Sequence, residues 1–216
     1  MDIRAIALDM DGVVLDSEGF HGRCGRGVCR RNGLVVPPGE WETFKGKRAH
    51  VIFSLIVERH GNGRPYDIEK LVQEWRRAFL RGAKNNIKLF QGVLNFLSFA
   101  KRRFSGTSLV TSSGKEVQAY MFEIFRLHRY FDVVVTGSDV AQGKPHPEPY
   151  LTAAERLKVR PKELLAVEDS KNGIVSAREA GCVVVGIATS YEREELMNYG
   201  AHYAVGDFRK LQLFFS

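Results

Sequence analysis

From residue 92 onward the chain alternates short apolar runs, rich in β-branched residues, with stretches of helical periodicity. Together with an apolar run near the start, they predict six strands, at residues 3–8, 108–111, 133–136, 164–168, 183–187 and 202–205. Helical patterns lie between them, for example at 93–103, 116–127 and 147–158. This order is typical of a doubly wound, mainly parallel sheet with helices on both faces. We therefore expect an α/β, Rossmann-like fold whose ligands bind beyond the carboxyl ends of the strands.

Residues 16–90 interrupt this alternation. They carry helical patterns at 50–59 and 68–81, separated by turns that contain glycine and proline, and show no convincing strand. We therefore expect a catalytic core of residues 1–15 and 92–216, with residues 16–91 forming a small α-helical domain inserted after the first strand. This second segment is called the helical insert below.

The positive charge of the chain is concentrated in this insert. Residues 16–90 hold 15 lysines and arginines against 8 aspartates and glutamates, whereas the remaining residues are balanced at 17 of each. Such a field attracts anions such as phosphate esters, nucleic acid or a membrane surface, although a solvated basic helix face explains it equally well.

The first predicted strand ends in Asp9-Met10-Asp11-Gly12. Side chains alternate along a strand, so the carboxylates of Asp9 and Asp11 point to the same side. Two close carboxylates repel each other unless a cation lies between them or one takes up a proton. The pair fits a metal site, or a nucleophile with an acid–base partner, but a solvated loop start often has the same sequence.

Two later strand ends carry groups that suit an anion. Thr111 and Ser112 precede a predicted helix, where hydroxyls and free backbone N–H groups form a cradle for phosphate. Lys144 lies between Gly143 and Pro145 in the loop after the third strand, which suits a fixed cation. Taken singly, plain helix capping and an exposed loop lysine explain these residues.

The fourth core strand ends in Glu168 and Asp169. Two acids at the end of an apolar strand are costly to bury unless a cation compensates them, and their hard oxygen atoms suit Mg²⁺. A solvated pair before a helix is the alternative. Together, the four strand ends supply a nucleophile, an acid–base group, a metal site and anion anchors, as phosphoryl transfer requires.

Four segments, DMDGVVLDSE, LVTSSG, GKPHPEPY and VEDSKNGI, resemble in this order the four motifs of the haloacid dehalogenase superfamily. The resemblance covers residues 1–15 and 92–206. It is greatest to the branch that holds β-phosphoglucomutase and small sugar-phosphate phosphatases, in which a helical cap domain follows the first motif. It implies a Mg²⁺-dependent phosphatase that hydrolyses small phosphate monoesters, sugar phosphates among them, through an aspartyl-phosphate.

The resemblance also assigns catalytic roles. Asp9 would attack the phosphorus, and Asp11 would protonate the leaving oxygen and then activate the hydrolytic water. The Asp9 carboxylate, the Asp11 main-chain carbonyl and the Asp169 carboxylate would hold Mg²⁺, with Glu168 beside them. The presence of Asp11 argues against dehalogenation, because dehalogenases have no phosphate ester to protonate.

The remaining assignments concern substrate binding. Thr111 and the Ser112 backbone N–H would bind the transferring phosphoryl oxygens, and Lys144 would neutralise charge on Asp9 and the phosphoryl group. In the helical insert, His21, Lys45 and Arg48 would contact the substrate, Lys45 and Arg48 through a second anionic group.

The start of the insert departs from the family pattern. Residues 18–27 contain four glycines, each of which destabilises a helix by about 1 kcal/mol relative to alanine. We therefore expect the first helix of the insert to be weakened, and the shape of the insert to differ from the family's.

Three other functions are compatible with parts of this pattern. A sugar-phosphate mutase would use the same Asp9 chemistry but return the phosphoryl group to the sugar, and His21 and Arg48 favour it slightly. A phospho-accepting receiver-like signalling module also combines acids, a hydroxyl and a lysine, but its phosphorylated aspartate follows a later strand. A nucleic-acid-binding module would use the basic field, but no recognisable motif accompanies it.

The remaining expectations concern location and partners. The sequence shows neither a signal-peptide pattern nor an apolar run long enough to span a bilayer. Its three cysteines are scattered, which favours reduced thiols in a cytoplasmic protein. We expect a small-molecule phosphate ester as the only partner, and a monomer, with a dimer as the alternative.

Overall fold

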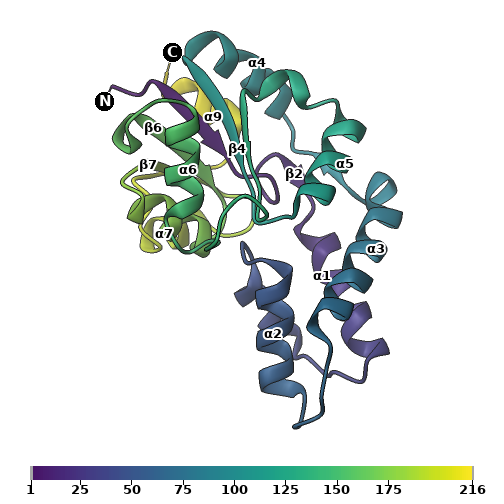
Figure 1. Cartoon of the computed structure of the whole chain (residues 1–216). Coiled ribbons are helices and arrows are strands. Elements are labelled where there is room, and N and C mark those ends of the chain that lie inside the picture. Colours follow the sequence, from purple (N-terminus) through teal and green to yellow (C-terminus); the bar gives the residue numbers. More distant parts are fainter. Residues whose placement is uncertain (1, 216) are drawn as a thin grey trace.

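The computed structural model describes residues 2–215. Its centre is a six-stranded sheet in the order β5-β4-β1-β6-β7-β8, in which every neighbouring pair is parallel (Figure 1). The strands are β1 (Ala5–Leu8), β4 (Gly106–Val110), β5 (Val133–Val135), β6 (Leu164–Glu168), β7 (Val183–Ile187) and β8 (Tyr203–Val205). All six strands predicted from the sequence are present, within two residues at each end, and the α/β fold is confirmed.

Helices cover both faces of this sheet. One face carries α4 (Val93–Arg103), α5 (Lys115–Phe125) and α9 (Phe208–Leu213), and the other carries α6 (Glu148–Arg156), α7 (Lys171–Glu179) and α8 (Arg193–Asn198). Along β1, Ile6 and Leu8 pack into the first apolar cluster, whereas Ala5 and Ala7 pack into the second. Because side chains alternate along a strand, a strand buried on both faces is apolar throughout.

The chain leaves and re-enters the core through a pair of very short strands. β2 (Leu15–Asp16) and β3 (Lys88–Leu89) are antiparallel neighbours, with Asp16 opposite Lys88. The expectation that residues 16–90 contain no strand is therefore wrong at both ends of this range. The two crossing segments run side by side, so each satisfies backbone groups of the other.

The helical insert lies between these two strands. It consists of α1 (Glu18–Arg31), the 3₁₀ helix η1 (Pro38–Phe44), α2 (Ala49–His60) and α3 (Ile68–Asn86), and Figure 1 shows α1, α2 and α3 grouped away from the sheet. It has an apolar cluster of its own, which contains Val28, Cys29, Leu34, Trp41, Phe44, Phe53, Ile56 and Leu71. The boundaries of the two domains, at 15/16 and 91/92, stay a prediction.

Helix α1 is continuous over its 14 residues, despite its glycines. At Gly25 a Cβ atom would lie 2.3 Å from the Trp41 ring, so only glycine lets the indole lie against the helix backbone. The helix expected to be weakened therefore forms over its whole length, and close packing against η1 opposes its low helix propensity.

Local capping follows the sequence pattern. The Ser170 side chain accepts a hydrogen bond from the Gly173 N–H at the start of α7, and Asp207 accepts one from the Lys210 N–H at the start of α9. Two further 3₁₀ helices, η2 (His128–Tyr130) and η3 (Pro161–Glu163), precede β5 and β6. Among the helices of the described residues, none combines the length and apolarity of a membrane span.

Candidate active site

Neighbouring strands β4, β1 and β6 bring the predicted site residues together at their carboxyl ends. The buried Lys144 Nζ donates to Asp9 Oδ1 and to Glu168 Oε1, both at 2.5 Å, and to the Val110 carbonyl at 3.0 Å. Lys144 itself comes from the loop after β5, 135 positions from Asp9. The predicted convergence of Asp9 and Lys144 on one point is thus present in the structure.

Burial dominates the electrostatics of these groups. It raises the pKa of Asp9 well above its usual value, and although Lys144 opposes this shift, Glu168, Asp169 and Asp11 add to it. Burial and Glu168 also raise the pKa of Asp169, to about 7. Burial alone would lower the pKa of Lys144, but the charges of Asp9 and Glu168 outweigh it and raise that pKa. Three buried carboxyl groups thus share one lysine, which leaves the cluster short of positive charge.

The same carboxyl groups fit a divalent cation. Asp9, Glu168 and Asp169 each offer an oxygen atom, and these atoms lie within 4.8 Å of one another. The Asp169 carboxylate approaches the backbone so closely that a Cβ at Gly12 would lie 1.9 Å from its Oδ2 atom, and Gly12 has a φ of +88°. The glycine of the first motif therefore makes room for this carboxylate, and hard carboxylate oxygens are the ligands that Mg²⁺ prefers.

Asp11 lies in a different environment from Asp9. Its carboxylate accepts hydrogen bonds from Ser17 Oγ at 2.6 Å and Ser113 Oγ at 2.9 Å, contacts His21 Nε2 at 2.8 Å, and lies 3.5 Å from Thr111 Oγ1. Burial would raise its pKa, but His21, Ser17 and Ser113 stabilise the charged form and hold that pKa at about 2. The two aspartates of the first motif therefore differ strongly in their tendency to ionise, because their surroundings favour a proton on Asp9 and a negative charge on Asp11.

His21, in α1 of the insert, contacts Asp11 directly. Its ring stacks on Trp75 and Phe79, with ring centroids 5.2 Å and 4.2 Å apart, and this holds its Nε2 atom against Asp11. The indole N–H of Trp75 also donates to the His21 carbonyl at 3.4 Å.

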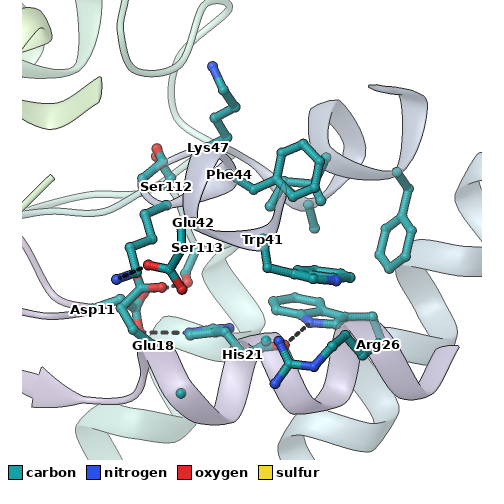
Figure 2. Close-up of a pocket in the computed structure, with 18 of the residues that line it drawn as sticks. Asp11, Glu18, His21, Arg26, Trp41, Glu42, Phe44, Lys47, Ser112 and Ser113 are labelled. Carbon is teal, nitrogen blue, oxygen red and sulfur yellow. Dashed lines mark hydrogen bonds and ion pairs between the residues drawn. The ribbon is translucent and has the colours of Figure 1, made fainter. Parts of the chain in front are cut away.

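A cavity of about 240 Å³ lies between the core and the helical insert, above Asp9 and Asp11. Figure 2 shows Asp11, Glu18 and Glu42 on one side of it, and Trp41 with Arg26 on the other. Of the residues predicted to bind substrate, His21, Lys45 and Ser112 line this cavity. Lys45 pairs with Glu42 Oε2 at 2.7 Å, and its Nζ lies 4.9 Å from the centroid of the Tyr191 ring.

Arg48 and Ser112 connect the insert to the core. The Arg48 guanidinium donates to the Val140 carbonyl at 2.9 Å and the Ala141 carbonyl at 3.1 Å, and it lies outside the 240 Å³ cavity. The Ser112 hydroxyl donates to the Gly46 carbonyl at 2.7 Å. The structure therefore places Arg48 at an attachment point between insert and core, and its predicted role as an anion ligand stays a prediction.

Sequence reasoning missed several residues of the site. Tyr150 Oη donates to Glu168 Oε1 at 2.5 Å, and Ser190 Oγ donates to Asp169. Ser113 lies in the segment LVTSSG and Tyr150 in the segment GKPHPEPY, so their position in the sequence could have identified them as site residues. The insert residues Trp41 and Glu42 had none, because only the packing of η1 over the core brings them to the cavity.

Comparison with known proteins agrees with this geometry. The family model for haloacid dehalogenase-like hydrolases matches residues 6–187. A phosphoglycolate phosphatase from Escherichia coli (strain K12) is 31% identical over 220 residues, which cover 92% of this chain and 84% of the relative. The Bacillus subtilis (strain 168) protein YhcW is 35% identical over 187 residues, which cover 85% of this chain and 83% of that protein.

Solved structures show the same fold. The crystal structure of CbbY from Rhodobacter sphaeroides, in complex with phosphate, is 25% identical, has a TM-score of 0.84 and covers 97% of this chain and 96% of its own. The family model spans most of the chain, and both relatives are matched over more than four fifths of their length. The chain therefore belongs to the haloacid dehalogenase-like hydrolases, in their phosphatase and phosphoglucomutase branch.

Proposed function

We propose that this chain is a Mg²⁺-dependent phosphatase that hydrolyses small phosphate monoesters through an aspartyl-phosphate on Asp9. The observation that carries the proposal is the buried cluster in which Lys144 contacts Asp9 and Glu168, with Asp169 within ligand distance of both acids. Such a cluster combines a nucleophile, a fixed cation and oxygen ligands at one point, beside a cavity open to a small ester.

The first chemical step belongs to Asp9 and Asp11. A carboxylate oxygen of Asp9 attacks the phosphorus, the ester P–O bond breaks, and the leaving alcohol oxygen takes its electron pair and a proton from Asp11. In the second step Asp11 removes a proton from water, which attacks the aspartyl-phosphate. Inorganic phosphate leaves, and the Asp9 carboxylate is regenerated.

The environment of Asp11 suits the second of these steps, and substrate binding prepares it for the first. With a pKa of about 2 it is ionised in the free enzyme, as the water-activating step requires. The negative charge of a bound phosphoryl group favours the protonated form of a nearby carboxylate, so substrate binding raises the pKa of Asp11 and prepares it as an acid. Its hydrogen bonds to Ser17 and Ser113 keep the carboxylate oriented in both states.

The carboxylates of Asp9 and Asp169, with Glu168 beside them, are the residues that would hold Mg²⁺. The bound ion supplies charge neutralisation for the nucleophile and for the phosphoryl oxygens. Lys144 adds a second positive charge, fixed by its contact with Glu168 and with the Val110 carbonyl. Thr111 and the Ser112 N–H, at the start of the segment that leads into α5, would bind the phosphoryl group.

A mutase is the alternative that His21 and Arg48 were expected to favour. In the structure Arg48 Nη1 and Nη2 bond to core carbonyls, so the second phosphate of a sugar bisphosphate finds no guanidinium in the cavity from this residue. We therefore favour hydrolysis, and we expect free phosphate rather than an isomerised sugar phosphate as the product.

Substitution of the nucleophile tests the proposal. We expect Asp9→Asn to lower the hydrolysis of p-nitrophenyl phosphate by at least about 10³-fold, because an amide cannot form the aspartyl-phosphate. Its far-UV circular dichroism should match that of the unchanged protein. Activity retained by Asp9→Asn would contradict the assignment. If the unchanged protein converts a sugar phosphate into its isomer without releasing phosphate, the mutase is favoured instead.

A further inference from the structure

The cavity next to Asp9 has two chemically different ends. Aspartates and serines of the core form the reacting end. The helical insert forms the opposite end with four aromatic rings, Trp41 and Phe44 from η1, Phe53 from α2 and Trp75 from α3. In Figure 2 the indole of Trp41 extends away from Asp11, Glu18 and Glu42. Rings from three separate elements thus line the part of the cavity that the insert forms.

The volume of the cavity indicates which group fits between these rings and the reacting end. A cavity of about 150 Å³ accommodates one benzene molecule. The cavity here measures about 240 Å³, which leaves space for a phosphoryl group and one ring of that size.

The charges around the cavity disfavour a second anionic group on the substrate. Two acids of the insert, Glu18 and Glu42, line the cavity in addition to Asp9 and Asp11. Lys45, the cation closest to them in sequence, is already paired with Glu42 at 2.7 Å. Among the described residues, a carboxylate or second phosphate would therefore find no unpaired cation beside Glu42. Burial and the charge of Asp169 raise the pKa of Glu18 well above its usual value, so that carboxyl group offers a hydrogen bond rather than a positive partner.

Of the other basic side chains near the cavity, two already donate hydrogen bonds to the core and one is exposed to water. Lys47 Nζ donates to Asn172 Oδ1 at 3.1 Å, and Arg48 bonds to carbonyls of the core. Arg26 is exposed, and its guanidinium lies 5.9 Å from the centroid of the Trp41 ring. This contact extends the aromatic wall, whereas water screens the charge of an exposed guanidinium.

We propose that the substrate is an arylmethyl or heteroarylmethyl phosphate monoester, whose single planar ring lies against Trp41 and which carries no second anionic group. This inference rests on the proposed phosphatase function. The balanced reaction is hydrolysis, in which the P–O bond to the arylmethyl alcohol breaks, the alcohol oxygen takes a proton, and water supplies the replacing oxygen of inorganic phosphate.

A panel of simple esters tests the proposal in the Mg²⁺-loaded full-length enzyme. Benzyl phosphate and cyclohexylmethyl phosphate have leaving alcohols of similar size and acidity but differ in the planar ring, and 2-phosphoglycolate adds a carboxylate. We expect kcat/KM for benzyl phosphate to exceed that for cyclohexylmethyl phosphate by about three- to tenfold, which is the factor typical of one aromatic contact. We expect 2-phosphoglycolate to be poorer than benzyl phosphate, on the order of tenfold.

Two variants separate ring recognition from general damage to the insert. Trp41→Leu keeps an apolar wall but removes the planar surface, so the benzyl to cyclohexylmethyl ratio should fall to near one. Tyr66→Leu changes an aromatic residue of the same apolar cluster that does not line the cavity, and its ratio should stay that of the unchanged enzyme. The ratio is internally controlled, because a variant that merely loosens the insert lowers both rates together.

Each outcome decides the proposal. A ratio near one in the unchanged enzyme, a preference for 2-phosphoglycolate, or a ratio that Trp41→Leu leaves intact overturns the ring-binding inference but not the phosphatase function. Failure to hydrolyse any of these esters, p-nitrophenyl phosphate included, and also the acyl phosphate acetyl phosphate, overturns the phosphatase function itself.

Discussion

Lys144 illustrates how single residues of this site depend on one another. Its ammonium group bonds to Asp9 and Glu168, and Tyr150 Oη donates to the same Glu168 oxygen. Replacing any one donor leaves buried carboxylate charge without compensation, which is more costly than the loss of an exposed ion pair. The tyrosine hydroxyl is therefore expected to position Glu168 and, through it, Lys144.

We expect Tyr150→Phe to lower the free energy of unfolding by about 1 to 3 kcal/mol, because a buried hydrogen bond to a charged group is lost. Urea denaturation of the two proteins measures this difference. Tyr203→Phe is the matched control, since no hydrogen bond of its hydroxyl is found among the described residues, and it should change stability little. An unchanged unfolding midpoint for Tyr150→Phe would show that its hydroxyl does not support Glu168.

The three cysteines give a second test at the residue scale. Cys24, Cys29 and Cys182 are unpaired and buried, and burial raises the pKa of Cys29 to about 11 and that of Cys182 to about 12. The thiolate is the reactive form, so we expect all three to react slowly with a thiol reagent in the native protein and fast in denaturant. Rapid labelling of the native protein would contradict this burial.

At the scale of elements, α1 shows how tertiary packing selects glycine inside a helix. A Cβ at Gly25 would meet the Trp41 ring at 2.3 Å, whereas a Cβ at Gly27 would meet only the flexible end of Arg31, at 3.4 Å. Both positions have the same low helix propensity in the sequence, yet only Gly25 is required by a neighbouring element.

This contrast predicts opposite effects for two alanine substitutions. Gly27→Ala should stabilise the protein by about 0.5 to 1 kcal/mol, because alanine is the better helix former. Gly25→Ala should destabilise it, because displacement of the buried Trp41 ring outweighs that gain. Chemical denaturation compares the two, and equal stabilisation by both would mean that Trp41 does not lie against α1.

At the scale of the whole molecule, the active site joins the two parts of the chain. Residues 45–48 of the insert bond to three separate core segments, through Ser112, through Asn172 and through the carbonyls of Val140 and Ala141. The insert thus covers the ends of the strands that carry Asp9 and Asp169. A cation bound between these acids would stabilise the arrangement as a whole.

We therefore expect Mg²⁺ to raise the melting temperature by about 5 to 10 °C at 100 times its dissociation constant, because a ligand that binds only the folded state stabilises it. EDTA should reverse the shift and silence hydrolysis of p-nitrophenyl phosphate. Asp169→Asn is the control and should lose the Mg²⁺ response. Turnover that persists in EDTA would rule out the metal site at these residues.

The sequence by itself determined the sheet and the residues at its carboxyl edge. Alternating apolar strands and amphipathic helices allow few arrangements other than a doubly wound parallel sheet, and such a sheet aligns the strand ends that carry Asp9, Thr111 and Asp169. Local sequence also determines the N-caps at Ser170 and Asp207, because capping involves only near neighbours in the chain.

Only the tertiary structure decided how the helical insert meets this edge. The ring wall of Trp41 and Trp75 and the attachment of Arg48 to core carbonyls arise from contacts between residues far apart in the chain. Basic residues in a sequence show only that charge is available. Whether that charge faces a substrate or a neighbouring carbonyl depends on packing, which no local pattern encodes.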